Sequence, residues 1–108
     1  MTKPEKNADL SALGEIDRLV HEPARLAVMA LLYVVNRADF IFLMNQTGLT
    51  WGNLSAHMSK LEEAGYLAVE KTFKGKRPNT MLRLTPKGRD AFRAYAGTMR
   101  QFFSDFPG

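Results

Sequence analysis

The 108-residue sequence contains no cysteine, so it can form neither a disulfide nor a thiolate metal site. This absence fits the reducing cytoplasm, where disulfides rarely persist. The N-terminal stretch MTKPEKNADL lacks the apolar segment that a signal peptide needs. The longest apolar run, Leu26 to Val35, is about half the length of a membrane-spanning helix. We therefore expect a cytoplasmic protein without a membrane span.

Motifs of enzymes and metalloproteins are missing as well. There is no Walker A loop, no GxGxxG after a strand and no GxSxG turn. The two histidines, His21 and His57, lie far apart, and neither forms a recognisable ligand pair with a nearby carboxylate. Glu62 and Glu63 are adjacent, so on a helix they diverge by about 100° and cannot share one substrate. We expect neither an enzyme nor a bound cofactor or metal.

The composition, with 45% apolar and 24% charged residues, is that of a soluble globular protein. The length predicts one domain over residues 9–108, after a flexible polar tail at residues 1–8. The net charge of +4 is unevenly distributed: residues 1–70 have a balance of −3 and residues 71–108 a balance of +7. Such asymmetry predicts a polyanion-binding side, for nucleic acid first and an anionic membrane second.

Apolar residues at helical spacing predict five helices, at about residues 9–21, 23–36, 40–47, 51–64 and 86–106. Their ends carry the residues typical of helix termini. These are proline at the first position (Pro23, Pro86), N-cap side chains (Asp9 or Ser11, Asp39, Thr50, Thr85) and terminal glycines (Gly48, Gly65). The second helix is apolar on almost every side, which predicts a central, buried position. The third and fourth helices form a predicted helix-turn-helix.

The spacing changes to a period of two after Gly65. Leu67, Val69 and Phe73 alternate with more polar residues, which predicts a strand. A turn cluster at residues 75–79 and a return strand at residues 80–84 complete a hairpin with a basic tip. We therefore predict a mainly helical α+β fold, a winged helix-turn-helix of order α-α-α-α-β-β-α.

The fourth helix carries the first indication of DNA binding. With Leu54, Met58 and Leu61 as its inner face, the outer side presents small or hydrogen-bonding residues, namely Gly52, Asn53, Ser55, Ala56, Ser59, Lys60 and Glu63. A helix with such a face can approach base edges in the major groove. An ordinary solvated helix face has a similar composition, so the helix alone leaves both interpretations open.

The hairpin favours DNA. Five cations fall within thirteen residues, opposed by the preceding Glu70; they are Lys71, Lys74, Lys76, Arg77 and Arg83. A projecting turn with Lys76 and Arg77 at its tip suits contact with phosphates or the minor groove. Basic hairpins also protect sheet edges from pairing with other strands, which is the alternative explanation.

Two segments carry a family resemblance. Residues 21–32 read HEPARLAVMALL, and residues 47–92 read TGLTWGNLSAHMSKLEEAGYLAVEKTFKGKRPNTMLRLTPKGRDAF. Over about residues 10–105 the chain resembles small prokaryotic winged-helix transcriptional regulators of the MarR/ArsR-like superfamily. Their patterns are H-x-P-x-R-L, G-N-L-S-x-H-x-x-K-L-E-E-A-G-Y and, in the wing, K-x-F-x-G-[KR]-x-P-x-T.

The resemblance implies a recognition helix from Thr50 to Ala64 and a wing at about residues 73–80. DNA contacts are implied for Thr50, Asn53, Ser55, Ala56, Ser59, Lys60, Lys74, Lys76 and Arg77. Trp51 departs from the family, which has a small or acidic residue there; we expect it to pack rather than to contact DNA. His57 matches the family's histidine, and either orients the helix, touches a phosphate or is simply half-buried.

The last helix continues its aromatic stripe beyond what a small core needs, through Phe102, Phe103 and Phe106. We expect the terminal helices to pair in a homodimer, as is typical of the family; the alternative is that they fold back onto their own domain. Tyr33, Tyr95, Met29 and Met99 could line a cleft for a small apolar effector, although core packing explains the same residues. The functional prediction is a transcriptional repressor that binds double-stranded DNA, and the alternative is a protein-interaction module.

Overall fold

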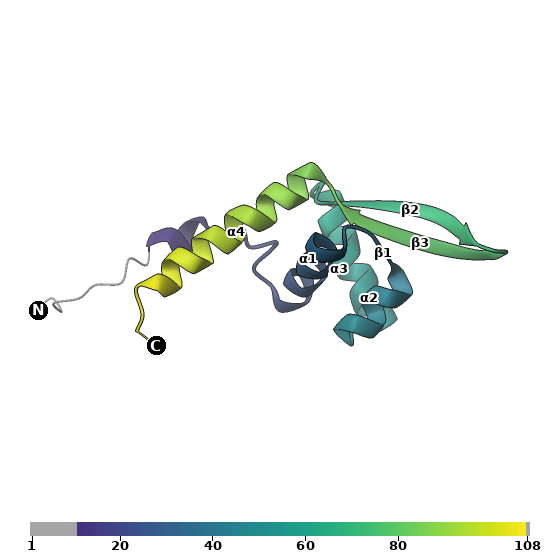
Figure 1. Ribbon diagram of the computed structural model, residues 1–108, viewed down its shortest axis with the longest axis horizontal. Helices are drawn as coiled ribbons and strands as arrows, with labels where there is room; N and C mark the ends of the chain where they lie inside the picture. The colour runs from purple at the N-terminus through teal and green to yellow at the C-terminus, as the bar shows by residue number, and fades with distance from the viewer. Residues whose placement is uncertain (1–10, 108) are drawn as a thin grey trace, which may run out of the picture.

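The computed structural model describes residues 11–107, so the tail predicted over residues 1–8 lies outside the described residues. The elements in chain order are η1 (Ser11–Glu15), α1 (Pro23–Val35), β1 (Ala38–Asp39), α2 (Phe40–Thr47), α3 (Trp51–Glu63), β2 (Leu67–Lys74), β3 (Arg77–Leu84) and α4 (Pro86–Ser104) (Figure 1). The predicted mixture of helices and one hairpin, in the order of a winged helix, is confirmed.

The helix termini follow the predicted residues closely. Asp39, Thr50 and Thr85 each accept a hydrogen bond from a backbone N–H in the first turn of the next helix, at 2.7, 3.2 and 3.0 Å. Gly48 ends α2 in the left-handed conformation, with φ 72°. These local capping interactions need no tertiary context, which is why the sequence predicts them well.

The predicted first helix is wrong in its extent. Of the expected residues 9–21, Asp9 lies outside the described residues and Ser11–Glu15 form a short 3-10 helix. The Asp17 carboxylate then accepts hydrogen bonds from the backbone of Leu19 and Val20, at 2.9 and 3.4 Å. Such a side chain offers the backbone an alternative to helical bonding. The chain therefore turns toward α1 instead of continuing as a helix.

The sheet contains a strand that the periodicity did not predict. β1 is two residues long and pairs antiparallel with β3, which gives the strand order β1-β3-β2. A segment of two residues shows no measurable alternation, so a period of two cannot reveal it in the sequence. β3 also begins at Arg77, earlier than the predicted residue 80.

The hairpin turn is correspondingly shorter than predicted. Only Gly75 and Lys76 separate the strands, with Lys74 opposite Arg77. Gly75 has φ 66° and Lys76 has no positive φ, as in a type II′ turn, whose twist matches that of the flanking strands.

The core lies where α1, α2, α3 and the base of the sheet meet. Its fully buried side chains are Val20, Val28, Met29, Leu32, Leu43, Leu54, Leu61 and Leu82. The molecule extends over 68 × 25 × 21 Å, and its radius of gyration of 17.2 Å exceeds the roughly 13 Å of a compact chain of this length. Figure 1 shows the reason: the β2–β3 hairpin and α4 project to opposite sides of the three central helices. Within residues 11–107, no helix has the length and apolar character to cross a membrane.

Candidate nucleic-acid interface

The outer face of α3 is as predicted. Leu54 and Leu61 are fully buried, and Met58 packs against the core. The opposite side exposes Asn53, Ala56, Ser59 and Lys60, with Ser55 half-buried at its flank and Thr50 exposed at the N-cap. The helix thus presents small polar side chains and one cation to solvent.

Charge divides this face along the helix. Glu62 and Glu63 are exposed in its last turn, whereas the first turn has no acidic side chain. The N-terminus of a helix also carries the positive end of its dipole. The N-terminal half of α3 is therefore the part that a polyanion can approach.

Trp51 lies at the first position of this half. Its ring packs against Phe40, with centroids 4.5 Å apart and planes inclined by 51°. The expected packing role is supported by this contact, yet 61% of the residue remains exposed. The exposed part of the indole borders the predicted contact face.

His57 faces α1 rather than solvent. Its Nδ1 atom lies 3.2 Å from the Arg25 guanidinium and 3.6 Å from the Glu22 carboxylate. Burial acts to raise the pKa of Glu22, but hydrogen bonds from the backbone of Arg25 and Ala24 and the nearby cations lower it below the ordinary value. His57 is thus a half-buried residue that links α3 to the start of α1.

The strand register gives the tip of the β2–β3 hairpin two different faces. Lys74 opposes Arg77 on one face, and Phe73 opposes Pro78 on the other. Within the described part of the chain, neither Lys74, Arg77 nor Lys76 of the turn forms an ion pair. By contrast, Arg37 pairs with a carboxylate, that of Glu70, at 3.2 Å. The positive charge of the tip is therefore uncompensated.

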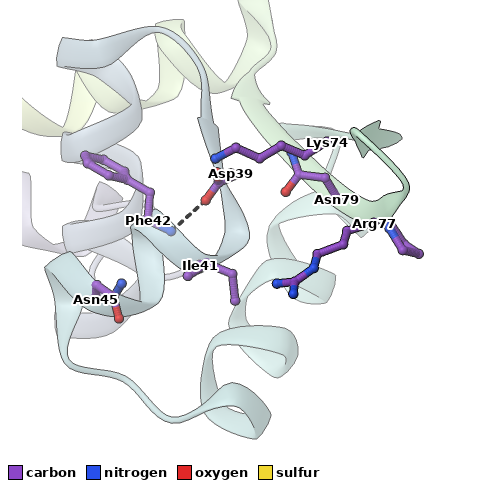
Figure 2. A pocket seen from close by; sticks show the side chains of 8 residues that line it. Asp39, Ile41, Phe42, Asn45, Lys74, Arg77 and Asn79 are labelled. Carbon is purple, nitrogen blue, oxygen red and sulfur yellow. Dashed lines mark hydrogen bonds between the residues drawn. The ribbon is translucent and has the colours of Figure 1, made fainter.

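The cationic face borders an open hollow of about 670 Å³ between the hairpin and the start of α2 (Figure 2). The hollow is lined by Asp39, Ile41, Phe42, Asn45, Lys74, Arg77, Pro78 and Asn79. In Figure 2 the Arg77 guanidinium points into it on the side of Ile41. The Asp39 carboxylate is engaged by the Phe42 N–H, drawn as a dashed line. The α2 residues of this hollow were not among the predicted sites, because only the fold brings them beside the hairpin.

Phe73 was expected on the buried side of its strand and is instead 74% exposed. Leu67 on the same face is buried, since the helices cover the base of the hairpin but not its tip. Alternation assigns residues to a face, but it does not show how far the covering layer extends. The sequence signal for this exposure is that Phe73 stands between Lys71 and Lys74 and two residues before the turn glycine, Gly75.

The residues suggested for an effector cleft form part of the core. Met29 is fully buried, Tyr33 packs against Phe92 with centroids 5.0 Å apart, and Tyr95 is buried. The Tyr95 hydroxyl lies 2.8 Å from the imidazole of His21, which is exposed. Within residues 11–107, no group of three or more histidine or acidic side chains is placed to hold a metal ion.

With this geometry described, sequence comparison gives the family. Residues 24–103 match the family described as winged helix DNA-binding domain. The chain belongs to this family. A relative of 36% identity over 78 residues is the uncharacterized protein MJ0432 of Methanocaldococcus jannaschii, with 72% of this chain and 85% of that protein covered.

Solved structures share the fold. A transcriptional regulator homologue from Pyrococcus horikoshii OT3 superimposes with a TM-score of 0.83 at 26% identity, covering 88% of this chain and 96% of that one. A MarR-family regulator from Silicibacter pomeroyi gives a TM-score of 0.62 at 19% identity, covering 90% and 65%. The family and the fold of this winged-helix protein are those of DNA-binding transcriptional regulators.

Proposed function

We propose that this protein is a cytoplasmic, homodimeric transcriptional regulator that binds specific sequences of double-stranded DNA and represses transcription by blocking polymerase. The observation that carries the proposal is the uncompensated positive charge of the hairpin tip beside the small, polar outer face of α3. A partner with regularly spaced phosphates and readable base edges matches both features.

In the proposed complex, the outer face of α3 enters the major groove, with the N-terminal end of the helix pointing into it. Asn53, Ser55, Ser59 and Lys60 supply donors and acceptors to base edges, and Ala56 permits close approach. Thr50 holds the first turn through its capping bond and contacts the backbone at the helix N-terminus. Acidic Glu62 and Glu63 keep the other end of the helix away from the phosphates.

The hairpin acts as the wing. Lys74, Lys76 and Arg77 contact phosphates that flank the major-groove site, or the edge of the next minor groove. The hollow between the wing and α2 provides room for one sugar-phosphate strand to pass along the cationic face. These contacts supply affinity that does not depend on sequence.

A dimer would place two recognition helices on half-sites about one DNA turn, or roughly 34 Å, apart. The support is α4, which projects from the body and carries exposed Phe103 next to Phe102, with exposed Phe106 just after the end of the helix. An exposed aromatic cluster of this kind is stabilised when a second copy covers it. A small apolar effector could act on such a dimer by changing the distance between its two recognition helices.

The test is binding of duplex DNA at about 0.15 M salt by the parent and by a variant with Lys76→Ala and Arg77→Ala. We expect the parent to bind, and the double variant to bind all sequences more weakly. If each cation contacts one phosphate, the slope of log K against log salt becomes shallower by about 1.8, at about 0.9 per lost contact.

Two outcomes would contradict the proposal. A parent protein that is not retained on duplex DNA at this salt concentration would favour a protein-interaction module. A double variant that binds like the parent at every salt concentration would show that Lys76 and Arg77 of the hairpin do not contact DNA.

A further inference from the structure

One side chain of the wing tip, Phe73, has no role in the proposed phosphate contacts of Lys74, Lys76 and Arg77. Phe73 is 74% exposed, although removal of an aromatic ring from water is favourable. It does not line the hollow that Lys74 and Arg77 border. The fold thus holds an apolar ring in solvent at the end of a projecting hairpin.

The strand register defines what lies around this ring. Phe73 is opposite Pro78, which is its cross-strand neighbour and also borders the hollow beside Lys74 and Arg77. The Phe73–Pro78 pair stabilises the hairpin, but the remaining exposure shows that Pro78 covers only part of the ring. Lys74 and Arg77 occupy the reverse face, Lys76 occupies the turn, and Lys71, two residues before Phe73, lies on the same face as the ring.

A tip that combines several cations with one exposed aromatic ring matches the chemistry of the minor groove. That groove is about 6 Å wide, its rims carry the phosphates and its walls are formed by deoxyribose rings and base edges. A two-residue turn makes the tip narrow, and its cations can contact a rim while an apolar side chain lies against the wall.

We propose that Phe73 is a DNA-contacting residue that places its ring against deoxyribose and base edges in the minor groove. The proposal rests on the proposed function of the protein, and it adds a salt-independent contribution to the phosphate contacts of the wing. It also explains why the ring remains uncovered in the free protein.

The experiment measures the affinity for a mixed-sequence duplex of about three helical turns over a series of salt concentrations. The variant is Phe73→Thr, because threonine favours a strand and replaces the ring with a small hydroxyl and methyl group. We expect the Kd to rise about tenfold at every salt concentration, with an unchanged slope, since an apolar contact releases no counterions. Phe73→Tyr keeps the ring and is expected to bind like the parent.

Val34→Ala is the matched control, because Val34 is 76% exposed but lies at the end of α1. It is expected to leave the affinity unchanged. A minor-groove-binding drug on an A·T duplex is expected to abolish the difference between the parent and Phe73→Thr, and a difference that persists would rule out the minor groove.

The results separate this inference from the proposed function. If Phe73→Thr binds like the parent while the Lys76→Ala, Arg77→Ala variant shows a shallower slope, the inference is overturned and the proposed function stands. A shallower slope for Phe73→Thr itself would mean that the ring acts only by positioning the cations. Failure of the parent to bind duplex DNA would overturn both.

Discussion

At the residue scale, Tyr66 connects two segments that are far apart in the sequence. Its hydroxyl donates a hydrogen bond to the Asp17 carboxylate, in the turn before α1. The same carboxylate caps the backbone of Leu19 and Val20. One acidic side chain thus holds both its own turn and the connection between α3 and β2.

This hydrogen bond predicts that the Tyr66 phenol has an unusually high pKa. The bond to Asp17, burial and the negative charge of Asp17 raise the pKa of Tyr66 to about 12, from 10.0. Because the fold prefers the neutral phenol, the stabilisation is complete below pH 10.0 and is lost as the pH rises toward 12. Tyr66→Phe should lower the free energy of unfolding at neutral pH by about 1 kcal/mol.

Ultraviolet titration and denaturant unfolding check this expectation. In the parent, one of the three tyrosines should ionise near pH 12, and Tyr66→Phe should remove that step. A parent whose tyrosines have all ionised before the pH approaches 12 would contradict the assignment.

At the scale of elements, the start of α4 is fitted closely to the connection between α3 and β2. The Thr85 N–H donates to the Tyr66 carbonyl at 3.0 Å, and the Thr85 hydroxyl donates to the Gly65 carbonyl at 2.5 Å. Gly88 is buried against the same backbone, and a Cβ there would lie 2.1 Å from the Tyr66 oxygen. The close approach requires a glycine at this position.

We expect Gly88→Ala to destabilise the protein by about 3 kcal/mol, because backbone must move to admit the methyl group. Gly97→Ala is the matched control in the same helix, since its Cβ would meet no atom within 4 Å. Better helix propensity should make that control more stable by about 0.5–1 kcal/mol. Thermal unfolding of both variants measures the contrast, and equal unfolding temperatures would contradict the packing described for Gly88.

At the scale of the whole molecule, the elongated shape separates the surface proposed to bind DNA from the surface proposed to form the dimer. The cationic wing lies at one end and the aromatic cluster of α4 at the other, with the core between them (Figure 1). This separation allows a second copy to bind at α4 without covering the recognition helix or the wing.

The dimer proposed here predicts the effect of a charge in the aromatic cluster. Phe103 is 58% exposed, so Phe103→Glu should keep the fold but prevent a second copy from covering the cluster. Light scattering should give about twice the 12.2 kDa chain mass for the parent and the single-chain mass for the variant. Val34→Glu, which introduces the same charge on exposed α1 surface, should remain dimeric; a monomeric parent would contradict the proposal.

Much of this architecture could be predicted locally. Asp39, Thr50 and Thr85 mark helix starts through bonds within one turn, and Pro23 marks one through its fixed φ and missing N–H. Alternation predicts the position of β2. The inner and outer faces of α3 follow from its spacing alone, and the family resemblance implies which residues of the outer face contact DNA.

Other features depend on which segments meet in space. The path of the chain between Glu15 and Pro23 depends on the Asp17 carboxylate. One of its oxygens accepts a hydrogen bond from the Leu19 N–H, and the other accepts one from the Tyr66 hydroxyl. β1 exists because β3 lies beside it. The exposure of Phe73 depends on how far the helices reach along the hairpin.

The sequence by itself determined the helix termini, the faces of α3 and the basic hairpin, because capping, periodicity and charge act over a few neighbouring residues. Only the tertiary structure decided that Gly88 touches the backbone of Tyr66, that α2 borders a hollow beside the wing and that Phe73 stays uncovered. These properties depend on distances between segments that are remote in the chain, and such distances are set by the packing of the core.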